Sequence, residues 1–230
     1  MSAAGWGQAI TLKGQVIVET AAGSAAKDAS GVVVWLTPLS NVRADNGAAA
    51  RTKSAALPHP RLVQTGKHFE PHLLIVPVGT AVEFPNKDPF FHNVFSLFEG
   101  KRFDLGLYEA GSTRMVRFDK PGISYIFCNI HPQMSAVVIA LATPYYAISN
   151  ANGEIVVHDL SAGRYMLDVW FERSLPEELA GFRRTVNVSD SDHSLGTIRL
   201  RSPGHLQVRH KNKYGKDYDD QTPATPGYPQ

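Results

Sequence analysis

Four side chains of this sequence could together hold a metal ion: His92, Cys128, His131 and Met134. Three of them form a Cys-x-x-His-x-x-Met pattern, and His92 lies upstream in a His-Asn-Val segment. Thiolate and thioether sulfurs are soft ligands that suit Cu(I), whereas imidazole suits both Cu(I) and Cu(II). A mononuclear blue-copper site uses this set, with the thioether as a weak axial ligand. The four residues therefore predict a copper site, provided that folding brings His92 to the other three.

The elements around these residues are predicted to be strands joined by a tight loop. Residues 122–128 are rich in β-branched and aromatic side chains, which indicates a buried strand that ends at Cys128. Residues 129–133 form the loop, in which Pro132 limits the backbone conformations. Residues 135–141 are predicted to be the next strand. One loop thus presents three of the candidate ligands, and a neighbouring strand must supply His92.

Three other interpretations of these residues remain open. Structural zinc sites usually use more Cys and His, in spacings such as Cys-x-x-Cys, so one Cys with a Met argues against zinc. Cys128 and His131 could form a catalytic pair, although no oxyanion or orienting motif accompanies them. Cys128 could also be a small buried hydrophobic residue, which is a common role for free Cys.

The residues around the candidate ligands resemble the cupredoxin family in its short-loop form, similar to plastocyanin and amicyanin. The resemblance covers about residues 64–143. Before the first His, it rests on Phe69, Gly79-Thr80, Val82, Phe84-Pro85-Asn86 and Asp88. Before the Cys, it rests on Phe118, Pro121-Gly122 and Tyr125.

This resemblance implies one copper ion per chain, with His92, Cys128 and His131 as equatorial ligands and Met134 as the axial ligand. It also implies that Asn93, outside the ligand set, joins the two ligand-bearing segments beside the Cys sulfur. Hydrogen bonding near a thiolate tunes the redox potential, so such a role is physically reasonable. A redox partner protein is expected to dock near His131.

Composition favours an all-β protein. The 230 residues are enough for one large or two small domains, and 19 Gly with 15 Pro indicate many turns. The net charge of +2, without a basic stripe, argues against nucleic-acid binding. A single Cys excludes an internal disulfide, and no apolar stretch approaches the length of a transmembrane helix.

The N-terminal residues bear on localisation. They lack the basic and apolar regions of a signal peptide. Because cupredoxins are commonly exported, we interpret this start as an expression Met placed before a mature periplasmic N-terminus. A truly cytosolic start is the alternative.

The predicted fold is a cupredoxin-like Greek-key β-sandwich at 61–143, accompanied by a second, smaller β-sandwich. Strands are predicted at 10–18, 31–36, 154–158, 164–171, 182–188 and 195–200, with a Gly-containing turn at 150–153. After this turn the sequence resembles carboxypeptidase regulatory-like, or transthyretin-like, sandwiches. The resemblance rests on Asn152-Gly153, Asp159-Leu160, Ala162-Gly163, Tyr165, Leu167 and Val169. A sandwich needs about seven strands and 144–201 supplies about five, so we expect 8–40 to complete it as a discontinuous domain. Two sequential modules are the alternative.

Two polar segments and a histidine cluster complete the prediction. Residues 41–60 are interpreted as a flexible linker, and 202–230, which lack hydrophobic periodicity, as a tail that is disordered or draped over the surface. His68, Glu70 and His72 would share one face of an extended chain and could form a second metal site. Pro71 indicates an irregular or edge strand, so solvated side chains are the simpler interpretation.

The predicted function is one-electron transfer at a type 1 copper centre in the periplasm, without enzyme activity, because four protein ligands leave no open coordination position. A copper chaperone, buffer or resistance protein is the alternative, although the chain has no Met-rich or His-rich tract to favour it. A metal-free adhesion or scaffold module is the third possibility.

Overall fold

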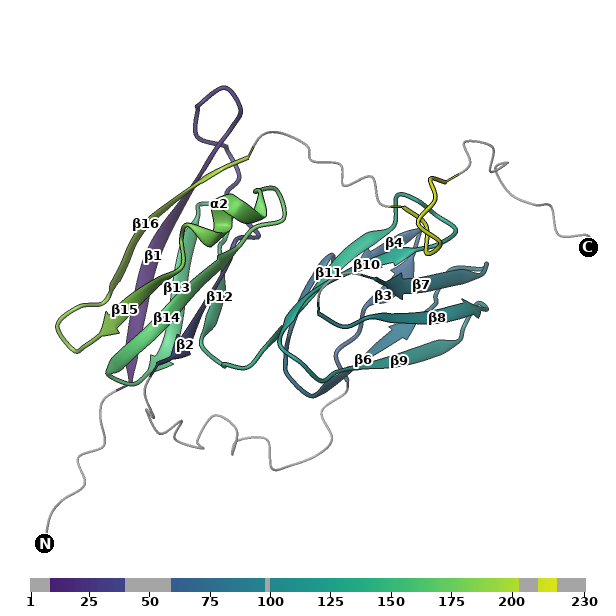
Figure 1. The fold of residues 1–230 in the computed structure, drawn as a ribbon, viewed down its shortest axis with the longest axis horizontal. Coiled ribbons are helices and arrows are strands. Elements are labelled where there is room, and N and C mark those ends of the chain that lie inside the picture. Colours follow the sequence, from purple (N-terminus) through teal and green to yellow (C-terminus); the bar gives the residue numbers. More distant parts are fainter. Residues whose placement is uncertain (1–8, 40–58, 98–99, 203–210, 219–230) are drawn as a thin grey trace, which may run out of the picture. The chain divides into compact units, whose positions relative to one another are not determined.

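The computed structural model describes residues 9–39, 59–97, 100–202 and 211–218. The chain divides into two compact units, each drawn in Figure 1. Unit 1 comprises Met1–Ala56 with Ala142–Gln207, and unit 2 comprises Leu57–Leu141 with Val208–Gln230. Among the described residues, one short helix accompanies many strands, so the predicted all-β class is confirmed.

Unit 1 is a sandwich of two sheets, ordered β13-β1-β16 and β12-β2-β14-β15. Its strands are β1 (Ile10–Glu19), β2 (Val33–Pro38), β12 (Tyr146–Ile148), β13 (Glu154–Leu160), β14 (Gly163–Trp170), β15 (Arg184–Val188) and β16 (Ser194–Arg201). The short helix α2 (Pro176–Ala180) lies between β14 and β15. The six strands predicted in this part of the chain are confirmed, with ends that differ by one to a few residues.

Alternation explains the core of unit 1. Ile10, Leu12, Val16 and Val18 of β1 are buried, and the residues that separate them are more exposed. These side chains pack with those of the facing sheet, including Leu36, in one hydrophobic cluster. The same strand pairs antiparallel with β13 and parallel with β16, so sequence-distant segments share one sheet.

Unit 2 contains the predicted ligand residues. Its strands are β3 (Val63–Thr65), β4 (His68–Glu70), β5 (Leu73–Pro77), β6 (Thr80–Pro85), β7 (His92–Ser96), β8 (Phe103–Tyr108), β9 (Thr113–Phe118), β10 (Gly122–Cys128) and β11 (Ser135–Leu141). Five of them form a sheet in the order β5-β11-β10-β7-β8, and β6 pairs with β9 in a second sheet. The predicted strands at 122–128 and 135–141 are confirmed.

The pairing of β7 with β10 brings together the two segments that carry the predicted ligands. The strands are antiparallel, with Val94 opposite Cys128 and Phe95 opposite Phe127. The start of β7, at His92, therefore lies beside the end of β10. Beneath them, a buried cluster that includes Phe84, Val94 and Ile126 fills the interior of the unit.

The predicted linker and the predicted tail are described only in part. The predicted linker at 41–60 lies almost wholly outside the described residues, as do 203–210 and 219–230 of the tail. Residues 211–218 of the tail are described, and they lie against unit 2 through hydrogen bonds discussed below. None of the helices in the described part of the chain is long and apolar enough to cross a membrane.

Candidate metal centre

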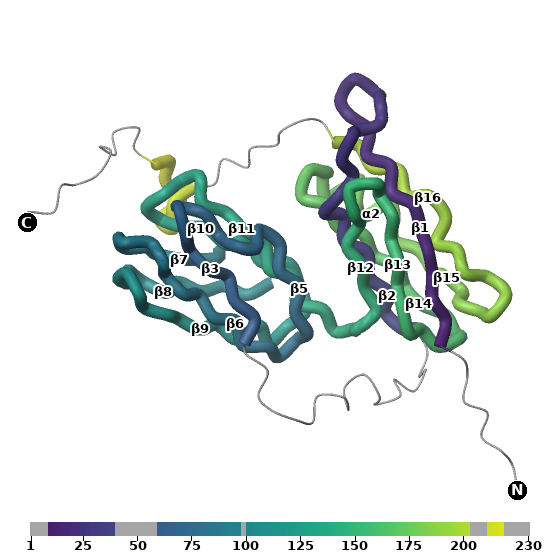
Figure 2. The backbone as a smooth tube through the Cα atoms, turned by 180° about the vertical axis from the view of Figure 1, so that it is seen from behind, coloured from purple at the N-terminus to yellow at the C-terminus, as the bar shows by residue number. Residues whose placement is uncertain are grey.

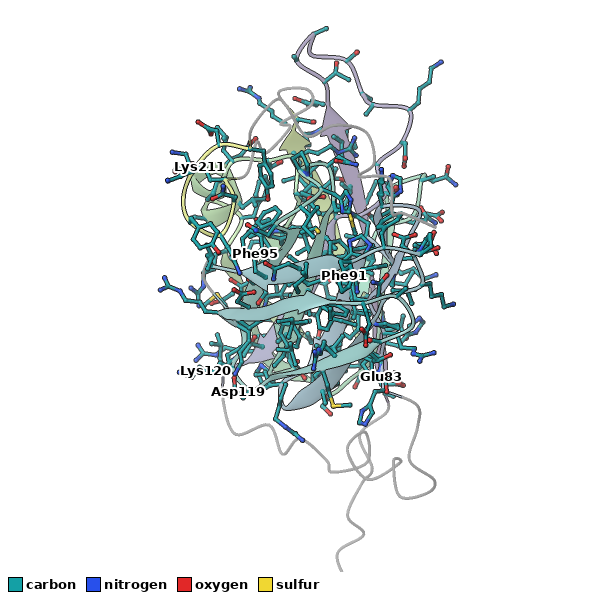
Figure 3. The ribbon with its side chains drawn as sticks, turned by 90° about the vertical axis from the view of Figure 1, so that its right-hand side faces the viewer. Glu83, Phe91, Phe95, Asp119, Lys120 and Lys211 are labelled. Carbon is teal, nitrogen blue, oxygen red and sulfur yellow. The ribbon has the colours of Figure 1, made fainter. Side chains whose placement is uncertain are left out.

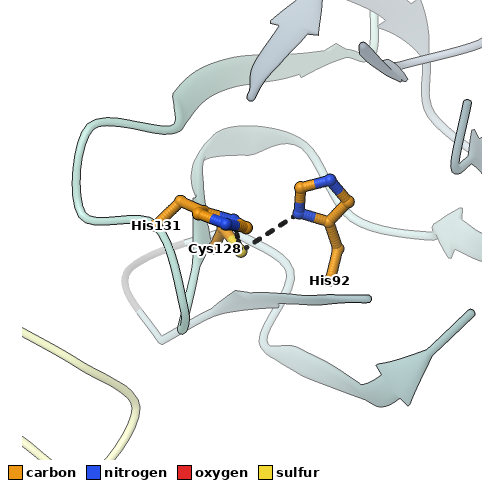
Figure 4. A group of neighbouring side chains, drawn as sticks. All are labelled: His92, Cys128 and His131. Atoms are coloured by element: carbon orange, nitrogen blue, oxygen red, sulfur yellow. Dashed lines mark hydrogen bonds between the residues drawn. The ribbon is translucent and has the colours of Figure 1, made fainter. Parts of the chain in front are cut away.

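Folding brings His92, Cys128 and His131 together in unit 2. Cys128 Sγ lies 3.6 Å from His92 Nδ1 and 3.7 Å from His131 Nδ1 (Figure 4). The three potential ligand atoms all lie within 4.8 Å of one another. His92 and Cys128 are fully buried, whereas His131 is partly exposed. This is the one such cluster of His, Cys, Asp and Glu found in the described residues.

These distances fit a single metal ion placed between the three atoms. Bonds of about 2.0 Å to imidazole nitrogen and about 2.3 Å to thiolate sulfur, as in zinc sites, separate the two donors by roughly 3.7 Å at a trigonal angle. The separations of 3.6 and 3.7 Å agree with that value. One soft sulfur and two imidazoles, held in a buried place, are a donor set suited to copper.

Asp88 fixes the orientation of the His92 ring. Its Oδ2 atom lies 2.9 Å from His92 Nε2, and both side chains are buried. An ionised carboxylate only accepts hydrogen bonds, so Nε2 carries the ring proton. The lone pair of Nδ1 is therefore available to a metal on the Cys128 side.

A tight turn at Gly66 and Lys67 holds Asp88 in place. The backbone N–H groups of Gly66 and Lys67 donate to its two carboxylate oxygens at 2.6 and 3.0 Å. Both residues have positive φ, at 58° and 59°. Burial would raise the pKa of Asp88, but the hydrogen bonds from Lys67, His92 and Gly66 outweigh it and hold that pKa below its usual value. The carboxylate thus stays charged beside His92.

Burial keeps the cluster uncharged without a metal. It raises the pKa of the Cys128 thiol, although the backbone amides of Asn93, Ile130 and His131 oppose that rise. Burial also lowers the pKa of His92, and it lowers that of His131 to about 4, to which the electrostatic interaction between the two imidazoles contributes further. Metals bind neutral imidazole and thiolate, so the histidines are ready to bind and the thiol must release its proton.

The ligand loop between β10 and β11 is tied to the strands by backbone hydrogen bonds. The Cys128 N–H donates to the Met134 carbonyl at 3.2 Å, and the Met134 N–H donates to the His131 carbonyl at 3.0 Å. Met134 is fully buried in the same hydrophobic cluster as Cys128. The fourth predicted ligand residue therefore lies in the interior beside the other members of the loop.

Asn93 connects the two ligand-bearing segments through its backbone. Its carbonyl accepts a hydrogen bond of 2.9 Å from the Asn129 N–H, next to Cys128. Its side chain points to β8 instead, where it donates to Asp104 Oδ1 at 2.6 Å and to the Gly106 carbonyl at 3.1 Å. The position of this residue thus couples three segments around the cluster.

The ring of Phe90 covers the two histidines. The Phe90 ring centroid lies 5.3 Å from that of His92 and 5.4 Å from that of His131. Phe91 is 39% exposed, whereas Phe95, at the other end of the same segment, is buried (Figure 3). Phe90 therefore shields the cluster, and Phe91, the next residue in the sequence, is an exposed apolar side chain.

The second histidine cluster takes no part in this centre. His68, Glu70 and His72 are exposed and lie outside the metal-ligand group found in the described residues. The His68 Nδ1 atom lies 2.7 Å from the Gly66 carbonyl, and the His72 Nδ1 atom lies 3.1 Å from the Ser135 carbonyl. Backbone groups thus already occupy one nitrogen of each ring.

Sequence reasoning assigned no role at the site to Asp88, Lys213 or Tyr218. Asp88 is four residues before His92, but that spacing is not informative in a chain that bends sharply between them. Lys213 and Tyr218 hydrogen-bond to Asn129 and Cys128 from the polar tail. No hydrophobic periodicity or motif marks them in the sequence.

Comparisons with known proteins give partial structural matches. No family model and no curated protein matches the chain. Among solved structures, it is similar to a copper-containing nitrite reductase from Thermus scotoductus, at 27% identity and a TM-score of 0.35 over 39% of this chain and 24% of that one. A purple cupredoxin from Nitrosopumilus maritimus matches at 26% identity and a TM-score of 0.33, over 36% of this chain and 99% of the other.

A reduced variant of amicyanin matches at 20% identity and a TM-score of 0.35, over 38% of this chain and 87% of that chain. The chain thus spans about a quarter of the nitrite reductase and most of the two smaller proteins. Unit 2 itself combines β-sheets with a buried His-Cys-His cluster, and this donor set suits one copper ion.

Proposed function

We propose that unit 2 is a type 1 copper domain that transfers single electrons, with His92, Cys128 and His131 as equatorial ligands and Met134 as the axial ligand. The observation that carries this proposal is the buried Sγ atom, which lies 3.6 and 3.7 Å from two imidazole nitrogens. Bound copper would supply the Cu(I)/Cu(II) couple.

The surrounding residues support electron transfer by keeping the ligands in place. Asp88 and the Gly66–Lys67 turn orient His92, and the β10–β11 loop constrains Cys128 and Met134. A site whose ligands need little movement serves both oxidation states with a small barrier. Burial of His92 and Cys128 excludes water from the space between them.

We infer that His131 is the route by which electrons leave. It is the partly exposed member of the cluster, and exposed Phe91 lies beside the Phe90 ring that contacts it. An apolar surface of this kind suits a redox partner protein. Four protein ligands would leave no open position for a substrate, so we propose an electron carrier rather than an enzyme.

We propose a periplasmic location on the basis of the resemblance to exported cupredoxins. Fractionation of the native host, with the chain followed by antibody, tests this location directly. Recovery with the cytosolic fraction would contradict it.

The proposed function is tested by the visible and EPR spectra of purified protein after one equivalent of Cu(II). The parent should show an intense thiolate-to-copper band, and Cys128→Ser should lose it because the band requires the thiolate. His131→Ala should also lose or change the band, whereas His158→Ala, exposed on β13, should not.

Other outcomes discriminate between the alternatives. A colourless protein that binds only Cu(I) would support a copper chaperone or buffer in place of an electron carrier. A protein that binds no copper would contradict both.

A further inference from the structure

The C-terminal segment 211–218, here called the strap, contacts the ligand loop of unit 2. The Tyr218 hydroxyl donates a hydrogen bond of 2.8 Å to the backbone carbonyl of Cys128. The Lys213 N–H donates one of 2.9 Å to Asn129 Oδ1, on the next residue. Figures 1 and 2 show the strap in yellow beside the turn between β10 and β11.

The strap also completes a closed ring of hydrogen bonds that includes the residues following His92 and Cys128. Lys213 Nζ donates to Asp104 Oδ2 at 2.9 Å, and Asp104 Oδ1 accepts from the Asn93 side chain at 2.6 Å. The Asn93 carbonyl accepts from the Asn129 N–H, and Asn129 Oδ1 accepts from the Lys213 N–H. Asn93 follows His92 and Asn129 follows Cys128, so the ring joins both ligand-bearing segments.

The strap has a defined internal structure of its own. The Asn212 side chain accepts hydrogen bonds from the N–H groups of Tyr214 and Lys216 at 3.0 and 3.1 Å. Gly215 has φ of 74°, which permits the turn that these bonds close. The Lys213 side chain is only 19% exposed, although it is charged. A tail that is merely solvated would leave such a lysine in water.

We propose that Tyr218 and Lys213 are positioning residues: the strap holds the Cys128 loop closed over the metal centre and thereby sets the geometry of the copper–thiolate bond. Its effect on copper rests on the proposed function, whereas its effect on the loop does not require copper. Because Tyr218 contacts the Cys128 carbonyl rather than the sulfur, the strap acts through the position of the backbone.

The copper-free protein gives the first test, through the rate at which Cys128 is alkylated. The chain has one Cys, so the signal comes from this residue alone. Tyr218→Phe removes only the hydroxyl, and we expect alkylation about fivefold faster. That factor corresponds to the loss of a hydrogen bond worth ~1 kcal/mol net from the closed state. Tyr214→Phe is the matched control, since this tyrosine of the same segment is 72% exposed.

Lys213→Met, compared with Lys216→Met, tests the second contact. Lys213→Met removes the ion pair with Asp104 but keeps the backbone bond to Asn129. We therefore expect it to speed alkylation by a smaller factor than Tyr218→Phe does. Lys216 is exposed and uses its backbone N–H within the strap, so Lys216→Met should leave the rate unchanged.

The copper-loaded protein gives the second test, through the hyperfine splitting of the Cu(II) EPR spectrum. This splitting reports how copper shares its unpaired electron with sulfur, so a displaced loop should change it in Tyr218→Phe and not in Tyr214→Phe. A merely structural role in stability would leave the splitting of the folded protein unchanged.

The outcomes separate the strap from the proposed function. Equal alkylation rates for Tyr218→Phe, Tyr214→Phe and the parent would overturn the proposal that the strap holds the Cys128 loop closed. This conclusion would hold whether or not the parent shows a blue-copper spectrum. An unchanged hyperfine splitting in Tyr218→Phe would overturn its influence on the copper site. Faster alkylation of Tyr218→Phe in a protein that binds no copper would overturn only the proposed function, and the role of the strap in closing the loop would stand.

Discussion

His92 and Asp88 form a buried pair in which the carboxylate lies 2.9 Å from Nε2, the ring nitrogen that does not face Cys128. One imidazole thus has two partners with different tasks. Nε2 is held by the carboxylate, and Nδ1 is left for a metal. The strength of metal binding should therefore depend on a residue that never touches the metal.

Asp88→Asn should lower copper affinity by roughly 10- to 100-fold, the usual cost of removing such a partner. The amide has one acceptor oxygen, so it cannot receive the three hydrogen bonds that now come from His92, Gly66 and Lys67. Competition with a Cu(I) chelator measures the effect. Asp119→Asn, at an exposed ion pair with Lys101, should keep the affinity of the parent. Equal affinities for both variants would contradict the prediction.

Met134→Leu should raise the reduction potential of the copper site while the protein stays folded. Leucine has a similar volume, so the substitution at this fully buried position should cost less than ~1.5 kcal/mol. The axial ligand tunes the potential, and loss of the thioether removes electron donation that favours Cu(II). Redox titration of the visible band measures the shift. Met115→Leu, at a residue that is 52% exposed on β9, is the control. A shift in both variants, or in neither, would exclude Met134 as a ligand.

Asp104→Asn should destabilise the protein at neutral pH and have less effect in acid. Burial would raise the pKa of Asp104, but hydrogen bonds from Lys213, Asn93 and Gly106 outweigh it and hold that pKa below its usual value. A carboxyl with a lowered folded-state pKa contributes fully above its unfolded pKa of about 3.9 and loses its contribution as pH falls through the folded value. The side chain is 40% exposed, so solvent screening limits the effect at pH 7 to about 0.5 kcal/mol.

Urea denaturation of the Asp104→Asn variant and the parent, from pH 7 down to pH 3, measures this difference. The two free energies of unfolding should converge as the pH falls below about 4. Asp190→Asn, at an exposed aspartate of unit 1, is the control, and its free energy of unfolding should stay close to that of the parent. A constant difference across the range would contradict the assignment.

Gly153→Ala should destabilise unit 1 more than Gly23→Ala does. Both glycines have similar positive φ, 79° and 77°, so the backbone cost of about 1 kcal/mol is common to the two. A Cβ at Gly153 would clash with the Val16 carbonyl oxygen, whereas one at Gly23 would meet nothing within 4 Å. Overpacking adds roughly 1–3 kcal/mol at Gly153 alone. Urea denaturation of both variants measures the difference, and equal losses would show that the turn moves away from β1 without cost.

Local patterns in the sequence were sufficient for much of the fold. The alternation at 10–18, the β-branched run at 135–141 and the turn at 150–153 each predicted an element that the structure contains. Each of these signals is contained within a few consecutive residues, so it can be recognised without knowledge of the rest of the chain. The predicted separation of 41–60 as a linker lies almost wholly outside the described residues and stays a prediction.

Residue type and spacing by themselves predicted the donor groups of the site, because Cys128, His131 and Met134 lie close together along the chain and His92 lies upstream in a His-Asn-Val segment. Only the tertiary structure decided what surrounds them. The pairing of β7 with β10 placed Nδ1 of His92 next to Sγ of Cys128. The turn between the paired strands β3 and β4 holds the Asp88 carboxylate that contacts the other nitrogen of the ring. Tyr218 reaches Cys128 across 90 residues of sequence. Polar contacts between distant segments leave no periodicity in the chain, since each depends on where whole strands come to lie.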